Sequence, residues 1–275
     1  MDIDKNTGNT AHQPILLGMV LLATLLIYMP GLSGNFLFDD HLNIVQNSAL
    51  HIADLTVDEL RDASLSGIAG PLKRPISMLS FSLNDYFFGL DPYYFKLVNV
   101  IIHLLNGVGL YFLSHLLLLL SRNSSLHSLS DKQISLVSLG AAALWLLHPL
   151  NTTSVLYIVQ RMNSLATLFT VCGLIAYCYG RLRLTTSSKG FWIAFSGIAL
   201  FTPLAILCKE TGALLPLYAA TIELTLIRFN TFSSKQAPFI KALWSIFGCV
   251  LLICLFVLIR SPDFILDSYT SRPFT

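Results

Sequence analysis

The sequence predicts an all-α polytopic membrane protein with about seven transmembrane helices, and three observations lead to this fold class. Of the 275 residues, 54% are hydrophobic and only 12% are charged. The mean hydropathy of +0.68 lies well above that of a soluble domain, whose surface must stay wetted. Seven apolar stretches are each long enough to cross the hydrocarbon core, which takes roughly 17 to 25 helical residues.

These stretches define the predicted organisation of the chain. The spans are expected at residues 14–30, 94–120, 134–150, 162–180, 191–207, 212–228 and 241–260. They form a transmembrane module at 14–260, between a cytoplasmic tail at 1–13 and an outward tail at 261–275 that we expect to be truncated. No small-residue cleavage site follows the first apolar run, so we interpret it as an uncleaved span.

Basic residues near the span ends predict the orientation, because cytoplasmic loops carry an excess of lysine and arginine. One face collects nine of them: Lys5, Arg122, Lys132, Arg181, Arg183, Lys189, Arg228, Lys235 and Lys241. The short loops of the other face contribute only Arg161 and Lys209. We therefore expect a cytoplasmic N-terminus and outward-facing first, third and fifth loops.

The first outward loop, residues 31–93, is the largest extramembrane segment and is predicted to hold two short helices. LTVDELRDASL (55–65) has Thr56 three residues before Glu59, the spacing of a capping box. RPISMLSFSLNDYFFGL (74–90) repeats apolar residues at helical spacing and carries aromatic residues typical of a membrane interface. Both helices are expected to lie on the outer leaflet, over the mouth of the bundle.

Two classes of function and site are excluded by composition. The net charge of +2, with no run of lysine and arginine, excludes a nucleic-acid partner. The five cysteines lie in or beside apolar runs without CxxC spacing, so they predict neither a disulfide framework nor a zinc site. We interpret them as small core residues.

The adjacent carboxylates Asp39 and Asp40, in NFLFDDH (35–41), lie close after the first span. One interpretation is a solvated turn or a helix cap. The other follows from their proximity: two neighbouring carboxylates resist ionising together, so one holds its proton more tightly and becomes a base near neutral pH. Adjacent carboxylates can also bind a divalent cation, which leaves metal dependence open.

Each polar residue within the predicted spans has both a structural and a functional interpretation. Asn99, His103 and Asn106 lie on one helix face, where they either hydrogen bond to neighbouring helices or line a wet cavity. His148 precedes Pro149, a pattern typical of a helix end with an interfacial histidine.

Arg161 and Lys209 lie at outward ends of spans, against the charge trend. Cations at this position suit a lipid phosphate, with Lys73 or Arg74 as further candidates. Alternatively, Lys209 pairs with Glu210 or extends to water.

Six segments, taken in order, resemble the membrane domain of the transmembrane and tetratricopeptide-repeat O-mannosyltransferases and their bacterial homologues. They are FDDHLNIVQN (38–47), RPISMLSFSLN (74–84), LVNVIIHLLN (97–106), HPLNTTSVLYIVQRMNSLATLFTV (148–171), CKETGALLPL (208–217) and YTSRPFT (269–275). The resemblance covers most of the chain, and the shared order makes it specific for the family.

The resemblance implies a GT-C glycosyltransferase, of bacterial type and resident in the inner membrane. Such enzymes transfer a monosaccharide from a polyprenyl-phosphate donor, here to a hydroxyl acceptor such as Ser or Thr of an exported protein. Asp39 and Asp40 would occupy the acidic motif, with one of them as general base. The residues assigned to the donor and its phosphate are Arg161, Lys209, Arg74, His148 and Glu210, and those assigned to the cavity wall are His103 and Asn99.

The chain departs from the family pattern at three places. It has Lys96 where relatives have His, Thr153 where they commonly have Glu, and it stops at Thr275 where they continue into further spans and tetratricopeptide repeats. Two alternatives therefore stay open. One is a transporter or channel with charged residues along its pathway, and the other is an inactive fragment that binds lipid or partner subunits.

Overall fold

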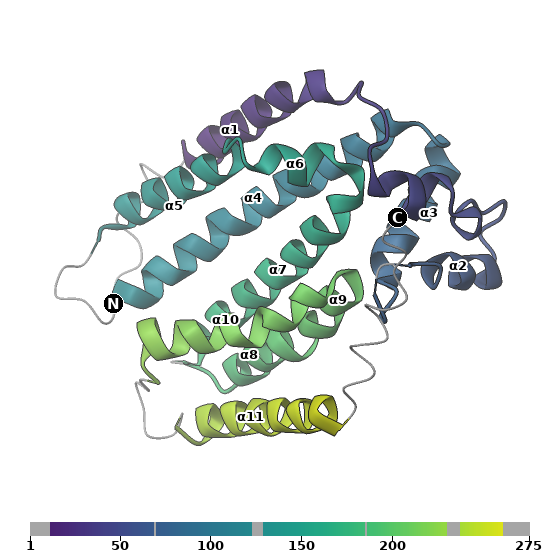
Figure 1. Ribbon diagram of the computed structural model, residues 1–275. Helices are drawn as coiled ribbons and strands as arrows, with labels where there is room; N and C mark the ends of the chain where they lie inside the picture. Colours follow the sequence, from purple (N-terminus) through teal and green to yellow (C-terminus); the bar gives the residue numbers. More distant parts are fainter. Residues whose placement is uncertain (1–11, 69, 123–128, 185, 230–236, 261–275) are drawn as a thin grey trace.

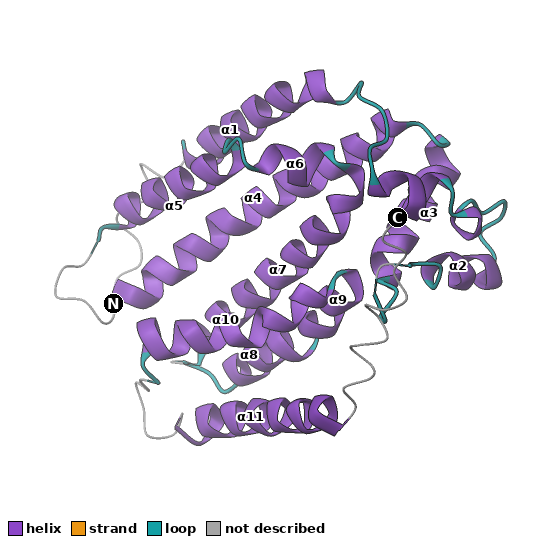
Figure 2. Ribbon diagram, in the orientation of Figure 1, coloured by secondary structure: helices purple, strands orange, loops and turns teal. Residues whose placement is uncertain are grey.

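The structure is a computed structural model that describes residues 12–68, 70–122, 129–184, 186–229 and 237–260. Within these residues all regular secondary structure is helical, as predicted (Figure 2). The α-helices are α1 (Gln13–Tyr28), α2 (Val57–Ser64), α3 (Pro75–Phe88), α4 (Pro92–Arg122), α5 (Asp131–Leu146), α6 (Asn151–Leu156), α7 (Arg161–Arg183), α8 (Lys189–Ala199), α9 (Phe201–Cys208), α10 (Leu215–Ile222) and α11 (Ala237–Arg260). Short 3-10 and π turns join them at η2 (Met29–Gly31), η3 (His41–Val45), η4 (Ser48–Leu50), η5 (Ile158–Gln160), η6 (Glu210–Leu214) and η7 (Glu223–Ile227).

The long helices run back and forth between two ends of a bundle (Figure 1). One end carries α2 and α3, the start of α7 and the junction of α9 with η6. The other carries the end of α4 and the starts of α5, α8 and α11. The predicted outward loops thus share one end and the predicted cytoplasmic loops share the other. Which end faces the cytoplasm stays a prediction.

Four of the predicted spans are supported by the length and composition of the helices. Among the described residues, the segments long and apolar enough to cross a membrane are Gln13–Gly31, Pro92–Ser121, Ile158–Arg183 and Lys189–Cys208. They correspond to the first, second, fourth and fifth predicted spans. The chain is therefore a polytopic helical membrane protein, and the count of seven stays a prediction.

Both short helices predicted in the first loop are present. α2 begins after Thr56, whose side chain accepts a hydrogen bond from the Glu59 N–H at 3.3 Å. The capping box is only half formed, because the Glu59 carboxylate accepts from the Ala53 and Asp54 N–H groups, at 2.7 and 3.0 Å. α3 matches the second predicted helix. Their position on the outer leaflet stays a prediction.

Glycines allow α7 and α8 to approach closely. A Cβ atom on Gly180 would lie 2.4 Å from the backbone N of Ala194 and 2.7 Å from the carbonyl O of Gly190. A Cβ atom on Gly173 would lie 2.6 Å from the carbonyl O of Gly197. Small residues at such contacts let two helix backbones pack in a bilayer, where lipid tails are as apolar as the side chains.

The Gly180→Leu variant should therefore unfold more readily. The added side chain meets backbone rather than flexible side-chain atoms, so we expect a loss of about 1–3 kcal/mol from overpacking. Gly140→Leu in α5 is the matched control, because a Cβ atom at that position would meet no atom within 4 Å. Thermal unfolding in detergent compares the two variants, and equal midpoints would contradict this packing.

A buried ion pair joins α7 to η7 near the end of the bundle where α7 finishes. The Arg181 guanidinium donates to both Glu223 carboxylate oxygens, at 2.8 and 2.9 Å, and the Tyr177 hydroxyl donates to the same carboxylate. All three side chains are buried. The carboxylate is thus fully paired inside the bundle, away from the predicted site.

Candidate active site

The adjacent carboxylates Asp39 and Asp40 lie in a tight turn that is hydrogen bonded to η5. The Asp40 N–H donates to the Leu37 carbonyl at 2.8 Å, and the Leu37 N–H donates back to Asp40 Oδ2 at 2.9 Å. The Val159 N–H donates to Asp40 Oδ1 at 2.7 Å. Asp40 is fully buried. Its carboxylate therefore holds the turn against the segment that leads into α7.

Burial dominates the electrostatics of this carboxyl group. It raises the pKa of Asp40 above the ordinary value of 3.8, because the charged form loses its hydration. The N–H groups of Leu37 and Val159 and the Lys96 ammonium oppose this by stabilising the charged form. Lys96, which the sequence marked only as a departure from the family pattern, is thus an electrostatic neighbour of Asp40.

Asp39 differs from Asp40 in being exposed. Its N–H donates to the Tyr157 hydroxyl at 3.0 Å, and its carbonyl accepts from the Asn43 side-chain amide at 2.9 Å. Burial raises the pKa of Tyr157, so the phenol keeps its proton beside the acidic turn. Sequence reasoning missed Tyr157, whose only signal was an aromatic residue at a span boundary.

A metal ion at the acidic pair stays a prediction. Among the described residues, no three His, Cys, Asp or Glu side chains are grouped to hold an ion.

Basic residues and Glu210 meet where α3 begins and α9 ends. The Arg74 guanidinium donates to the Glu210 carboxylate, with Nη2 2.9 Å from Oε2 and Nε 3.2 Å from each oxygen. Lys209 is half-buried. Burial lowers its pKa below 10.5, as does Arg74, while Glu210 opposes the shift. Glu210 thus pairs with Arg74, whereas the alternatives for Lys209, a pair with Glu210 or extension to water, stay predictions.

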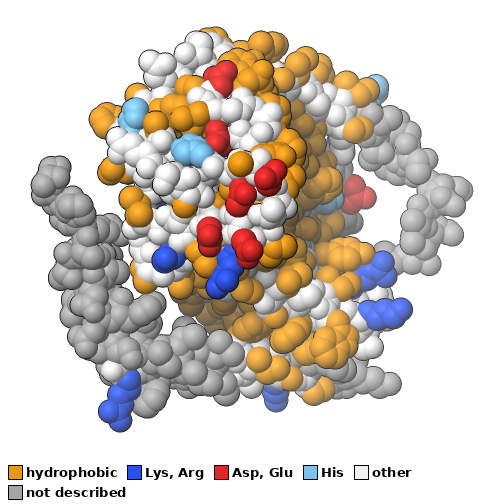
Figure 3. All heavy atoms as spheres, turned by 90° about the vertical axis from the view of Figure 1, so that its right-hand side faces the viewer, with side chains coloured by type: hydrophobic (Ala, Val, Ile, Leu, Met, Phe, Trp, Pro, Cys, Tyr) orange, Lys and Arg blue, Asp and Glu red, His pale blue; other side chains and the backbone are white. Residues whose placement is uncertain are grey.

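The segment 157–162 touches both groups of charged residues. It contacts the acidic turn through Tyr157 and Val159, and the Met162 sulfur accepts from Arg74 Nη1 at 3.3 Å. Viewed from this end, the molecule shows acidic side chains gathered on its surface with basic side chains at their margin (Figure 3). The contacts of segment 157–162 therefore place the acidic turn and the Arg74–Glu210 pair at the same end of the bundle.

Arg161 does not belong to that exposed surface. It is fully buried, and its guanidinium lies 4.7 Å from the Phe81 ring centroid. It donates to Asn99 Oδ1, Ser80 O, Asn84 Oδ1 and Phe95 O, at 2.7, 3.0, 2.7 and 2.8 Å. A guanidinium engaged in this way joins α3 and α4 to α7. We therefore assign Arg161 to the fold and not to the lipid phosphate.

The polar face of α4 also serves helix packing. The Asn99 amide donates to the carbonyls of Val155 and Ile158, at 3.1 and 3.2 Å. His103 Nε2 lies 3.0 Å from the Leu146 carbonyl, at the end of α5. Both side chains are buried. They satisfy carbonyls freed where neighbouring helices end, so the geometry favours interhelical bonding over the predicted cavity wall.

His148 lies in an exposed turn after α5, where its Nδ1 accepts from the Leu150 N–H at 3.2 Å. Among the described residues, no hydrogen bond joins it to the acidic turn or to the Arg74–Glu210 pair. The structure thus supports the helix-end interpretation and gives no contact for the predicted role in donor binding.

A groove is lined in part by η6, the segment that follows Lys209. It has a volume of about 280 Å³ and lies between α4, α7 and the η6–α10 segment. Its wall is apolar apart from four hydroxyl-bearing side chains: Thr167, Thr170, Thr211 and Tyr218. Thr211 follows Lys209 closely in η6. The groove therefore lies within the apolar bundle and reaches η6, the segment that starts with Glu210.

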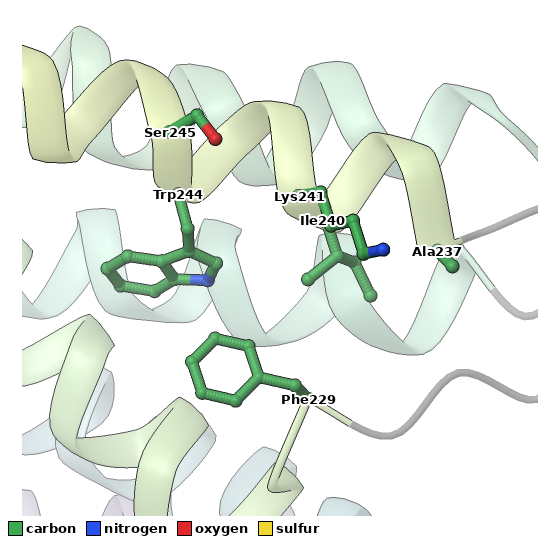
Figure 4. A pocket seen from close by; sticks show the side chains of 6 residues that line it. All are labelled: Phe229, Ala237, Ile240, Lys241, Trp244 and Ser245. Carbon is green, nitrogen blue, oxygen red and sulfur yellow. The ribbon is translucent and has the colours of Figure 1, made fainter.

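Another cavity, of about 570 Å³, lies between the end of η7 and the start of α11 (Figure 4). Its lining includes Phe229, Lys241 and Trp244. None of the predicted site residues lines it, so its size alone gives it no role in the chemistry at the charged end.

Comparison with known protein sequences places the chain in a family. Human protein O-mannosyl-transferase TMTC4 is 27% identical over 252 residues, which cover 86% of this chain and 33% of the human protein. Mouse protein O-mannosyl-transferase TMTC1 is 30% identical over 204 residues, covering 69% and 20%. Tmtc1 of Drosophila melanogaster is 34% identical over 192 residues, covering 68% and 20%. The chain is a relative of the TMTC protein O-mannosyl-transferases.

The TMTC relationship confirms the predicted family resemblance, while a bacterial origin stays a prediction. The chain spans between 19% and 33% of the length of the TMTC relatives. No family model and no solved structure matches it. The family assignment therefore rests on the TMTC sequences, and the roles of individual residues rest on the geometry above.

Proposed function

We propose that the chain carries the catalytic membrane module of a glycosyltransferase. It would move a monosaccharide from a polyprenyl-phosphate donor to a hydroxyl group of an exported protein, on the outer face of the membrane. The observation that supports this most directly is the exposed Asp39 at the end of the bundle that also carries Lys209 and η6, whose Thr211 lines an apolar groove. The names of the TMTC relatives supply the reaction class.

In the proposed step, the acceptor oxygen attacks the anomeric carbon of the sugar and gives its proton to the Asp39 carboxylate. The bond between that carbon and the phosphate oxygen breaks, and polyprenyl phosphate leaves with the bonding electrons. Asp39 suits the base because it is exposed to an acceptor, whereas both Asp40 oxygens accept backbone N–H groups. Asp40 positions the turn.

Lys209 is the proposed partner of the donor phosphate. Its ammonium is half-buried, so its attraction to a phosphate oxygen is screened less than that of an exposed lysine. Charge grows on the phosphate as the sugar leaves, and a fixed cation stabilises that change. The apolar groove beside η6 would take the first part of the polyprenyl chain.

Donor affinity should therefore fall with rising pH. The pKa of Lys209 is lowered, so the free protein loses this charge at a pH below 10.5, while the phosphodiester stays anionic. Lys209→Arg should remove the fall, because a guanidinium stays protonated throughout this range. Lys209→Ala should weaken binding about tenfold, the cost of roughly one charge-assisted hydrogen bond.

These affinities can be measured with labelled polyprenyl-phosphate mannose and the protein in lipid nanodiscs. Lys241→Ala is the matched control, because Lys241 is an exposed lysine near the start of α11, which lies at the other end of the bundle (Figure 1). Equal affinity for the parent protein, Lys209→Ala and Lys241→Ala would refute the phosphate role of Lys209.

A further inference from the structure

Phe38, immediately before the proposed base, combines exposure with an unfavourable backbone conformation. Its side chain is 82% exposed. Its φ angle of 40° lies in the left-handed region, which bulky residues rarely adopt because Cβ crowds the backbone. An exposed aromatic ring held in such a conformation needs an explanation, since strain of this kind clusters at functional sites.

The neighbouring hydrogen bonds force Phe38 into this conformation. The turn closes on both sides of it, through the reciprocal bonds of Leu37 and Asp40 and a 3.1 Å bond from the His41 N–H to the Phe38 carbonyl. The bond between Asp40 and the Val159 N–H then fixes the turn to η5. The chain thus presents the Phe38 ring outward rather than into the core.

Tyr157 supports the ring from the protein side. The two rings meet edge to face, with centroids 6.4 Å apart and an interplanar angle of 85°. The Tyr157 hydroxyl also accepts the Asp39 N–H, so one residue orders both the aromatic ring and the backbone of the proposed base. The Phe38 ring and the Asp39 carboxylate therefore share Tyr157 as a neighbour.

We propose that Phe38 is the surface on which the transferred sugar ring packs. A pyranose has one face of C–H groups, which packs on an aromatic ring, while its hydroxyl groups need acceptors such as a carboxylate at the edge. Phe38 would thus be a substrate-positioning residue that orients the anomeric carbon near Asp39. This inference rests on the proposed transferase function and identifies its sugar subsite.

The main rival explanation is that Phe38 inserts into lipid. Replacing Phe38 with different residues distinguishes the two explanations, because leucine keeps the apolar volume and loses the aromatic face. Sugar packing predicts that Phe38→Tyr resembles the parent protein, while Phe38→Leu raises the KM for polyprenyl-phosphate mannose about three- to tenfold. Lipid insertion predicts that Phe38→Leu resembles the parent protein.

Phe38→Gly tests the strain directly. Glycine adopts positive φ freely, so this variant should unfold at the same or a higher temperature while its KM rises as in Phe38→Leu. A structural role for the ring would instead lower the unfolding temperature.

The experiment measures transfer kinetics, donor binding and thermal unfolding for all four proteins in nanodiscs. Transfer by the parent protein with an unchanged KM in Phe38→Leu and Phe38→Gly would overturn the sugar subsite and leave the transferase function standing. Failure of the parent protein both to bind the donor and to transfer would overturn the two proposals together.

Discussion

Asp39→Asn should lose transfer while keeping donor affinity. The amide cannot accept the acceptor's proton, and removing a general base typically costs about 10² to 10⁴ in rate. The side chain is exposed, and the bonds from the Asp39 N–H to Tyr157 and from Asn43 to the Asp39 carbonyl do not need the carboxylate, so the fold should be preserved. The asparagine side chain can still contact the Tyr157 phenol, which interacts with the Asp39 carboxylate in the parent protein. Transfer from labelled polyprenyl-phosphate mannose to a peptide containing Ser and Thr measures the rate, and binding in nanodiscs measures the affinity.

Asp40→Asn is the matched control, one residue along the chain. In the parent protein each of the two Asp40 carboxylate oxygens accepts one backbone N–H, whereas the amide of asparagine has only one acceptor oxygen. We therefore expect a loss of about 1–3 kcal/mol in stability. Its effect on transfer should follow its effect on unfolding. Full activity of Asp39→Asn, together with an inactive but normally stable Asp40→Asn, would assign the base to Asp40.

Local sequence patterns predicted the helical elements well. The capping residue Thr56 and the apolar spacing of residues 74–90 depend on neighbours along the chain, and both helices occur as expected. The lysine and arginine pattern separated the loops into the same two groups as the two ends of the bundle. These signals act over a few turns of helix and need no knowledge of tertiary contacts.

The roles of the polar residues depended on partners that no local pattern specifies. Arg161 and Lys209 carry the same signal in the sequence, a cation at an outward span end. Arg161 meets neutral oxygens from α3 and α4 and is buried, while Lys209 lies half-buried beside Arg74 and Glu210. The contact of Tyr157 with Asp39 likewise joins residues that lie 118 positions apart.

Arg161→Met should be the most damaging substitution for the fold. It leaves Asn99 Oδ1, Ser80 O, Asn84 Oδ1 and Phe95 O without their donor. Each buried acceptor left unpaired costs about 1–3 kcal/mol, so a total loss of about 4 kcal/mol or more is expected. Thermal unfolding in detergent should show a strongly lowered midpoint, or the variant should fail to accumulate in membranes.

Arg161→Lys should rescue little, because an ammonium is a compact point charge and cannot reproduce the planar fork that serves acceptors on two helices. Asn84→Leu is the graded control: it removes one acceptor of the same guanidinium and should cost only about 1–3 kcal/mol. From highest to lowest, the expected unfolding midpoints are those of the parent protein, Asn84→Leu, Arg161→Lys and Arg161→Met.

If Arg161→Met unfolded like the parent protein and lost only donor affinity, the guanidinium would be a phosphate ligand. Lys209→Ala should keep the unfolding midpoint of the parent protein and lose donor affinity, because the Lys209 ammonium is not part of the α3–α4–α7 junction. The contrast between the two cations separates folding from donor binding.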